Sequence, residues 1–235
     1  MILLITSKQN KSFKLYQSLK LKKYRDQHGL FLVYGRHLVS QAKEKGVVVE
    51  VLSSNPNEDA TLYEKSLMDD LQQAETYFDL IAVCKKIENK KDSNRILVLD
   101  DVQDPDNVGA LIRSAAAFGF MRIILSTQSA DLYNEKTIRA SKGAIFDVYV
   151  ERKPLFEALS MLKNEGYQII YADAHEEGKP SKSEKTVLIL GNEGHGISDR
   201  VKELSNGAIH IETKNVESLN VSVAGAILMY QWRDL

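Results

Sequence analysis

From residue 96 onward, short apolar runs alternate with segments that have helical spacing. The runs "RILVLD", "RIILS", "YQIIYAD", "TVLILG" and "AIHIE" have the length of strands and are apolar almost throughout. The segments between them, such as "NVGALIRSAAAFG", repeat apolar residues every three to four positions. Continuous apolar strands that alternate with helices predict a parallel sheet covered on both faces. The last apolar run, from Val221 to Trp232, predicts a buried helix.

The first part of the chain also contains strand-like apolar runs and segments with helical spacing. Residues 7–29 place apolar side chains at three-to-four spacing and predict one amphipathic helix with a lysine-rich outer face. "LFLVYG" and "VVVEVLSS" predict strands, residues 36–46 predict a helix that ends at Gly46, and residues 60–78 predict another helix. A small α/β domain fits this pattern.

The stretch "CKKIENKKDSNR" separates the two patterns, because it combines charge with Asn and Ser and has no apolar period. We therefore expect an N-terminal α/β domain over residues 1–88, a linker over 89–95 and a parallel-sheet domain over 96–235.

Composition excludes several classes of protein. The 235 residues are 43% hydrophobic and 27% charged, which is typical of a soluble globular protein. No apolar run approaches the ~18 residues that a membrane span needs, and "MILLITSK" is too short for a signal peptide. A single cysteine, Cys84, excludes an intramolecular disulfide and a Cys-based zinc site. We therefore expect a protein of the reducing cytoplasm. The histidines show no H-x-x-x-H or H-E-x-x-H spacing, so we expect no metal site.

Charge is distributed unevenly along the chain. Net charge is −1, but residues 1–48 carry ten Lys or Arg against two acidic residues, a local net of +8. Such asymmetry indicates a polyanionic partner. A solvated lysine-rich helix face explains the charge alone equally well.

The first of three unusual loops is "LDDVQDPDNVGALIRSA". In a parallel sheet, ligands bind beyond the carboxyl ends of the strands, and this loop follows such an end. Asp104 to Asp106 predict a turn, and we expect the helix to open at Asn107 or Val108. Arg113 is a charge among small and apolar neighbours. Gly109, four residues earlier, would leave room for its side chain to lean back toward Asn107; the alternative is a solvated arginine.

The second loop, "VLILGNEGHGIS", runs from an apolar strand into three glycines. It lacks the Lys-Ser/Thr of a P-loop and the G-x-G-x-x-G of a dinucleotide site. Glu193 at its centre suits a ligand with amino or hydroxyl donors.

The third loop places Ser218 and Asn220 before the last helix, where one could cap the helix and the other could face a ligand. Pattern alone thus predicts an α/β enzyme for an adenosine-like or sugar-like ligand.

Together and in this order, "DPDNVGALIRSA", "LILGNEGHGIS" and "VESLNVSVAGAI" resemble the three motifs of the SpoU/TrmH family of RNA ribose methyltransferases, in the SPOUT class. "IRASKGAIF" is similar to the segment between the first two motifs, and the basic start resembles the RNA substrate-binding domain of many members. The resemblance implies a C-terminal trefoil knot, S-adenosylmethionine as methyl donor, and a homodimer with its site at the interface. It also implies transfer to a ribose 2′-hydroxyl, of ribosomal RNA in preference to tRNA, without a metal.

The resemblance also assigns residues. The family's catalytic positions fall on Asn107, Arg113, Glu193, Ser218 and Asn220. Its cofactor contacts fall on Gly191, Asn192, Gly196, Ile211, Leu219 and Asn220. RNA phosphates would be bound by the basic start, with Lys20, Lys22, Lys23, Arg25 and Arg36 as candidates.

Two positions depart from the family pattern. Tyr34 stands where the family usually has Glu, which would change contacts of the RNA-binding domain. Glu212 stands where it usually has Pro, which would change the cofactor pocket.

Three other functions stay open at this point. The chain could methylate a tRNA ribose or base on the same fold, or could be an RNA-binding module without catalysis. A nicotinamide-dependent oxidoreductase also fits a parallel sheet, although the missing G-x-G-x-x-G disfavours it.

Overall fold

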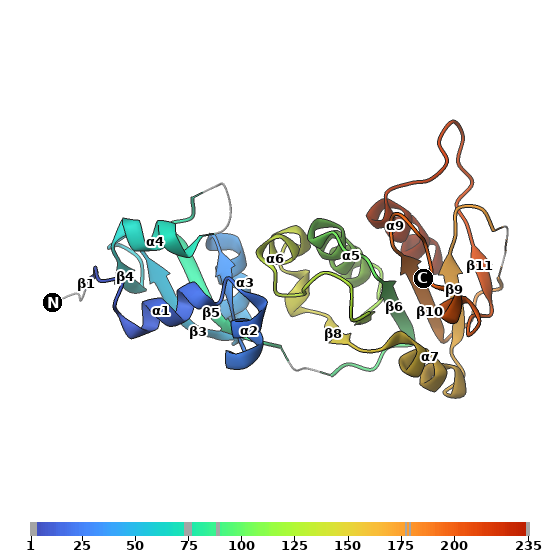
Figure 1. Cartoon of the computed structure of the whole chain (residues 1–235), viewed down its shortest axis with the longest axis horizontal. Coiled ribbons are helices and arrows are strands. Elements are labelled where there is room, and N and C mark those ends of the chain that lie inside the picture. Colours follow the sequence, from blue (N-terminus) through green and yellow to red (C-terminus); the bar gives the residue numbers. More distant parts are fainter. Residues whose placement is uncertain (1–3, 73–76, 88–89, 177, 179, 234–235) are drawn as a thin grey trace.

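The structure is a computed structural model that describes residues 4–233 apart from 73–76, 88–89, 177 and 179. The chain forms two α/β units placed one after the other along the long axis of the molecule (Figure 1). The first unit ends with strand β5 (Leu80–Lys85), and the second begins with β6 (Arg95–Asp100). The linker expected over residues 89–95 stays a prediction: residue 89 is outside the described residues, and Arg95 already belongs to β6.

The second unit contains the predicted parallel sheet. Its strands follow the order β11 (Gly207–Ile209), β9 (Gln168–Ala172), β10 (Thr186–Gly191), β6, β7 (Arg122–Leu125), β8 (Tyr149–Arg152). Every pair of neighbours is parallel. The order reverses beside β6, since β7 and β8 lie on one side of it and β9 to β11 on the other. Such a reversal is where a parallel sheet opens a crevice for ligands.

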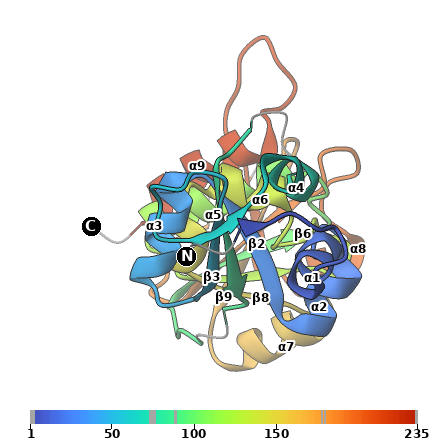
Figure 2. The same ribbon diagram turned by 90° about the vertical axis from the view of Figure 1, so that its left-hand side faces the viewer.

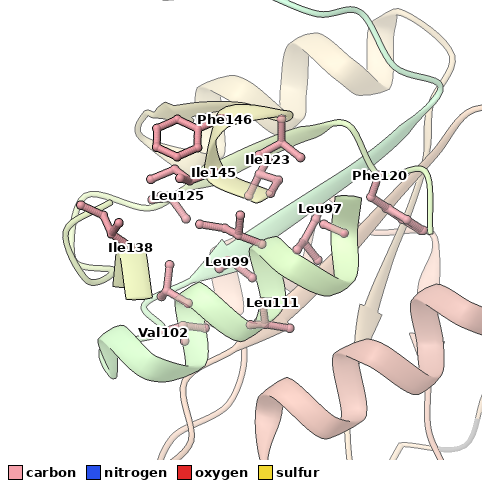
Figure 3. Close-up of a cluster of buried hydrophobic side chains, with 14 of the residues drawn as sticks. Leu97, Leu99, Val102, Leu111, Phe120, Ile123, Leu125, Ile138, Ile145 and Phe146 are labelled. Carbon is pink, nitrogen blue, oxygen red and sulfur yellow. The ribbon is translucent and has the colours of Figure 1, made fainter. Parts of the chain in front are cut away.

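Helices cover both faces of this sheet, as continuous apolar strands require. Helices α5 (Pro105–Ala117), α6 (Glu135–Ser141) and α9 (Val221–Trp232) cover one face; α7 (Leu155–Asn164) and α8 (Asp199–Lys202) cover the other. Alternate residues of β6 serve the two faces: Leu97 and Leu99 pack in the first core, Ile96 and Val98 in the second. Figure 3 shows the first core, where Leu97 and Leu99 of β6 lie beside α5, the helix that carries Leu111.

Helix α5 begins two residues before the earlier of its two expected starts. The Asp104 side chain accepts a hydrogen bond from the Asp106 amide at 3.0 Å and caps the helix, and Pro105 occupies its first position. The role expected for Gly109 is wrong. A Cβ at Gly109 would lie 2.4 Å from the Thr137 carbonyl oxygen and 2.6 Å from Ala140 Cβ. The glycine therefore lets α5 and α6 pack closely, and it does not make room for Arg113.

The first unit has a mixed sheet. Its strands follow the order β1 (Leu4–Ile5), β4 (Thr61–Tyr63), β3 (Val48–Ser53), β5, β2 (Leu30–Tyr34), and β5 is antiparallel to both of its neighbours. Its helices are α1 (Lys11–Ser18), α2 (Lys22–His28), α3 (Arg36–Glu44) and α4 (Lys65–Leu71). Seen along the long axis, α3 lies on one side of this unit and α1 and α2 on the other (Figure 2).

Two sequence predictions for the first unit need correction, and one strand was missed. Residues 7–29 form two helices, because the chain leaves the helical path between Ser18 and Lys22. Residues 60–78 contain strand β4 before the short helix α4, and residues 73–76 lie outside the described residues. Strand β5 was not predicted, although it lies between β2 and β3 in the sheet.

One apolar core runs through both units. Phe31 and Val33 of β2 belong to the same buried cluster as Tyr133 and Ile138 of the second unit. The alternate residues of β2, Leu32 and Tyr34, pack instead with α1 and α4. The sheet of the first unit is thus covered by its own helices on one face and partly by the second unit on the other.

Helix α9 confirms the predicted C-terminal helix. It packs against α5 and β10, and Gly225 meets Leu111 and Leu190 so closely that a Cβ would lie 2.4 and 2.6 Å from their side chains. The trefoil knot expected for this end of the chain stays a prediction.

Candidate functional site

A cavity of about 600 Å³ opens at the carboxyl ends of β9, β10 and β11. Its walls come from the segments that follow these strands and from the first turns of α9. Its volume is in the range of small-molecule sites, and its position is the one expected for a parallel sheet. In Figure 1 these segments lie toward the end of the molecule away from the first unit.

Most of the predicted site residues line this cavity. They are Gly191, Asn192, Glu193, Gly196, Ile211, Ser218, Leu219 and Asn220. The prediction missed Asp173 and His175, which follow β9, and Glu217, which follows β11. The signal that could have found them is the same one that marked the other loops, since each segment follows a predicted parallel strand.

The glycine loop between β10 and α8 closes on itself. The backbone amides of Asn192 and Gly196 donate to each other's carbonyl oxygens at 3.1 and 3.0 Å. A Cβ at Gly191 would lie 2.5 Å from the Gly196 carbonyl oxygen, and Gly196 has a φ of +70°. Both positions therefore need glycine for backbone reasons, and the closed turn presents Glu193 at its tip.

The end of β6 anchors the two ends of this loop. Asp100 Oδ2 accepts hydrogen bonds from the Ser198 amide at 2.9 Å and the Ser198 hydroxyl at 2.8 Å. The Asn192 side chain donates to the Asp101 carbonyl oxygen at 2.9 Å. Neither aspartate was singled out in the sequence, because a buried acceptor at a strand end leaves no periodic signal.

Hydrogen bonds join the three sequence motifs. Asn107 Nδ2 donates to Glu193 Oε1 at 2.8 Å, and Asn220 Nδ2 donates to Asn107 Oδ1 at 3.1 Å. Asn220 Oδ1 in turn accepts from the amides of Ser222 and Val223 at the start of α9. Asn107 does not line the cavity but orients two residues that do. Asn220 is therefore the cap, and Ser218 is the residue left free, as the sequence allowed.

Not every polar side chain of the three motifs is bonded within the part of the chain that the structure describes. Arg113, Glu217 and Ser218 are exposed and form no hydrogen bond or ion pair with any residue that the structure describes. Arg113 does not line the cavity of its own chain. Among the described residues no hydrogen bond joins Arg113 to Asn107, whose amide atoms bond Glu193 and Asn220, and the predicted approach of Arg113 to Asn107 stays a prediction.

Asp173 at the cavity wall is already committed to partners. Its carboxylate accepts from the backbone amides of His175 and Glu176 and from Lys202 Nζ at 3.1 Å. Burial alone would raise the pKa of this carboxyl, but these partners outweigh burial and hold the pKa below its ordinary value.

The cations of the first unit differ in how they are bound. Lys22 pairs with Asp26 at 2.5 Å, and Lys23 lies over the Tyr24 ring at 5.8 Å. Arg36 is exposed and bonds two carboxylates, those of Glu58 and Asp79. Lys20 is half-buried, and burial lowers the pKa of its ammonium.

Arg25 does not fit the predicted set of RNA-binding residues. It is 5% exposed, and its guanidinium donates to the Leu19 and Lys20 carbonyl oxygens and to Asp131. A phosphate cannot reach it without breaking these bonds, so Arg25 is a structural residue.

The two departures from the family pattern have little effect on the cavity. Tyr34 is buried, and its hydroxyl donates to the Leu71 carbonyl oxygen at 3.1 Å, so it stabilises the first unit internally. Glu212 is exposed and is absent from the cavity wall, although its neighbours Ile211 and Thr213 line it. The change that we expected in the pocket from Glu212 is therefore not seen.

Within the described residues, no three His, Cys, Asp or Glu side chains form a group that could hold a metal. A search of the same residues finds no helix with the length and hydropathy of a membrane span. Cys84 is buried in β5, and burial raises the pKa of its thiol to about 12.

Comparison with known proteins identifies the two units. The model of the SpoU rRNA methylase family matches residues 94–230, and the model of the MRM3-like substrate binding domain matches residues 10–97. The chain is 34% identical to the 23S rRNA (guanosine(2553)-2'-O)-methyltransferase RlmP of Bacillus subtilis, over 97% of this chain and 98% of that one.

Solved structures show the same arrangement. A protein of Porphyromonas gingivalis assigned to the TrmH family of RNA methyltransferases matches with a TM-score of 0.81 and 30% identity, over 94% of this chain and 96% of that one. An AdoMet-bound rRNA methyltransferase of Sinorhizobium meliloti shares the fold with a TM-score of 0.85 at 21% identity, over 97% of this chain and 96% of that one.

Proposed function

The chain belongs to the SpoU rRNA methylase family, and from this premise we propose that it methylates a ribose 2′-hydroxyl of ribosomal RNA with S-adenosylmethionine as donor. The observation that carries the proposal is the hydrogen-bonded series Glu193–Asn107–Asn220 beside the cavity. It joins residues from all three motifs at one place, where a cofactor and an acceptor hydroxyl would meet.

The cavity suits this cofactor chemically. Leu190, Ile209 and Leu219 supply apolar surface for an adenine ring, and the glycine loop supplies backbone groups at close range. The carboxylates of Glu193 and Glu217 suit the amino and hydroxyl donors of the ligand, and their negative charge suits a sulfonium. When bound, S-adenosylmethionine supplies an electrophilic methyl group.

The chain's own residues then position the acceptor and stabilise charge. A ribose hydroxyl is a weak nucleophile that loses its proton as it attacks, so negative charge develops on its oxygen. The unpaired guanidinium of Arg113 is suited to stabilise that charge and to bind the adjoining phosphate. It is not assigned as the base, because a guanidinium stays protonated in proteins. The free Ser218 hydroxyl would orient the acceptor, while Asn107 holds Glu193 in place.

The basic start of the chain would bind RNA phosphates. Lys20, Lys22, Lys23 and Arg36 remain in the proposed set, and Arg25 leaves it. Contacts of this kind give affinity that falls with salt but carry little sequence information.

A homodimer with its site at the interface belongs to the same proposal. On α9, Val223 is 49% exposed and Tyr230 is 53% exposed, and the Tyr230 ring packs edge-on against Phe118, just after α5, at 5.7 Å between ring centroids. A second copy would cover these apolar side chains. A shared site would also explain why Arg113 is exposed and lies off the cavity wall of its own chain.

Methyl-labelled S-adenosylmethionine, incubated separately with unmodified ribosomal RNA and tRNA, tests the reaction and the substrate together. After digestion to nucleosides, label on a 2′-O-methyl nucleoside from ribosomal RNA is expected. Label from tRNA alone would show that the substrate is tRNA and not ribosomal RNA. Label on a base would show that the acceptor is not a ribose hydroxyl. No label from naked RNA or from assembling ribosomal particles, with the cofactor bound, would favour an RNA-binding module.

A further inference from the structure

The two units meet through apolar contacts that have little directionality. The Phe31 ring of β2 packs on the Tyr133 ring at 4.5 Å between centroids, within the core that both units share. The Ile87 amide donates to the Tyr133 hydroxyl at 2.9 Å. Apolar burial stabilises such an interface without selecting one relative placement, because it depends on area more than on angle.

A buried ion pair adds direction to this interface. Arg25 of α2 donates to Asp131 of the second unit at 2.6 Å, and the two side chains are only 6% and 17% exposed. The same guanidinium donates to the Leu19 and Lys20 carbonyl oxygens at 2.8 Å each. One side chain therefore ties the turn between α1 and α2, next to the exposed Lys22 and Lys23 of α2, to the second unit.

The segment that carries Asp131, residues 126–131, is itself fixed by hydrogen bonds to other parts of the second unit. Arg152 donates to four of its carbonyl oxygens, those of Ser126, Thr127, Ser129 and Ala130. The Ser126 hydroxyl donates to the Asp101 carboxylate at 2.6 Å. Asp101 is the residue whose carbonyl oxygen accepts from Asn192 of the glycine loop. A continuous set of hydrogen bonds thus runs from the α1–α2 turn to the cavity.

A second ion pair between the units is of a different kind. Lys45 and Asp147 are 2.6 Å apart, but each side chain is 46% exposed. Exposed pairs contribute little to geometry or stability because water competes for both partners. This pair therefore provides a matched control on the same interface.

We propose that the Arg25–Asp131 pair sets a fixed offset between the lysines of α2 and the methyl-transfer site, and so determines which nucleotide of a bound RNA is modified. The inference rests on the proposed function. The first unit and strands β9 and β11 lie toward opposite ends of the long axis (Figure 1), so RNA held at one end presents to the site only a nucleotide at the matching distance. A buried ion pair selects one placement where apolar contacts would allow several.

The first experiment measures the offset without RNA. Spin labels on Gln17→Cys in α1 and Glu157→Cys in α7 report the distance between the units, and both positions are exposed. Cys84 does not compete for the label, because it is fully buried. Asp131→Asn is expected to broaden the distance distribution, whereas Asp147→Asn should leave it as in the parent. An unchanged distribution in Asp131→Asn would overturn the proposal, whatever the RNA result.

The second experiment maps the methylated nucleotide. The parent should modify one position, and Asp131→Asn should spread label to neighbouring nucleotides. Because misplacement of reacting groups is costly, kcat should fall by about tenfold to a hundredfold while KM for S-adenosylmethionine stays unchanged. Asp131→Glu, which keeps the charge, should restore most of the selectivity. One methylated position with parental kcat in Asp131→Asn would contradict the proposal.

A second variant covers the case in which Asp131→Asn fails to fold. Arg25→Lys keeps the charge but offers its donors from a single nitrogen, whereas Arg25 bonds the two carbonyl oxygens with one nitrogen and Asp131 with another, so it should shift both readouts in the same direction. Unchanged readouts in a folded Arg25→Lys would then overturn the proposal. A parent that labels no RNA would refute the proposed function, while the distance measurement would still decide whether the offset is fixed.

Discussion

Arginines of the first unit are bound within the fold, whereas Arg113 of the second unit is exposed and bonds to no residue that the structure describes. Arg25 and Arg36 both belong to a stretch whose charge suggested RNA contacts, yet each already has carboxylate partners. Arg113 stands in an apolar helix where a solvated side chain was a fair alternative. The difference teaches that net charge along a segment says less about binding than whether each charge is already paired.

The ion pairs of these two arginines differ in how deeply they are buried. Arg25 is buried with Asp131, and removing one partner of such a pair leaves an uncompensated charge inside the protein. Arg36 is paired at the surface, where an ion pair contributes about 0–1 kcal/mol and can be exchanged for a phosphate. Only the first arrangement excludes a role in RNA binding.

The comparison is tested most strongly by Arg113→Ala. Loss of a group that stabilises charge in the transition state should lower kcat by about 10²–10³-fold. The free energy of unfolding should change by less than about 0.5 kcal/mol, because the side chain is exposed and unpaired. Methyl transfer and urea unfolding of the same preparation measure both. Arg200→Ala, at an exposed arginine that packs on Phe156 instead, is the control and should keep full activity. Retained activity in Arg113→Ala would remove Arg113 from the mechanism.

A smaller effect is expected from replacing helix caps. One of the two caps compared here stabilises only its helix, whereas the other also bonds a residue of the site. Asn10 caps α1 through the Phe13 amide, and Asn220 caps α9 while bonding Asn107. Replacing either with Ala should cost about 1 kcal/mol of stability. Only Asn220→Ala should also weaken S-adenosylmethionine binding, which calorimetry measures directly. Equal cofactor affinity in both variants would reduce Asn220 to a helix cap.

The smallest effect concerns the lysines of α2. Lys23 has a ring contact but no carboxylate partner among the residues that the structure describes, whereas Lys22 pairs with Asp26. Lys23→Ala should lower the slope of log affinity against log salt by about 1, and Lys22→Ala should lower it less. RNA binding measured from low to moderate salt gives the slopes, with Lys163→Ala in the second unit as control. An unchanged slope in Lys23→Ala would show that this lysine-rich helix face is only solvated and does not contact RNA.

Local pattern was enough to predict much of the architecture. The parallel sheet followed from apolar runs, since a strand buried on both faces has no polar face to interrupt it. The cavity followed from the loops after those runs, and Gly191, Glu193 and Asn220 lie at it as expected. The choice between Ser218 and Asn220 as the cap was correctly limited to these two residues. These features depend on neighbours a few residues away, which the sequence displays directly.

Partners distant along the chain were decided only by tertiary structure. Arg25 binds Asp131 across 106 residues, and Asn107 binds Glu193 across 86 and Asn220 across 113. Gly109 was assigned to Arg113 because both lie on one helix, whereas its real neighbour is α6. Strand β5 is held by two antiparallel neighbours from elsewhere in the first unit. In each case the deciding contact forms only when segments far apart in the sequence pack together, so no local period could have revealed it.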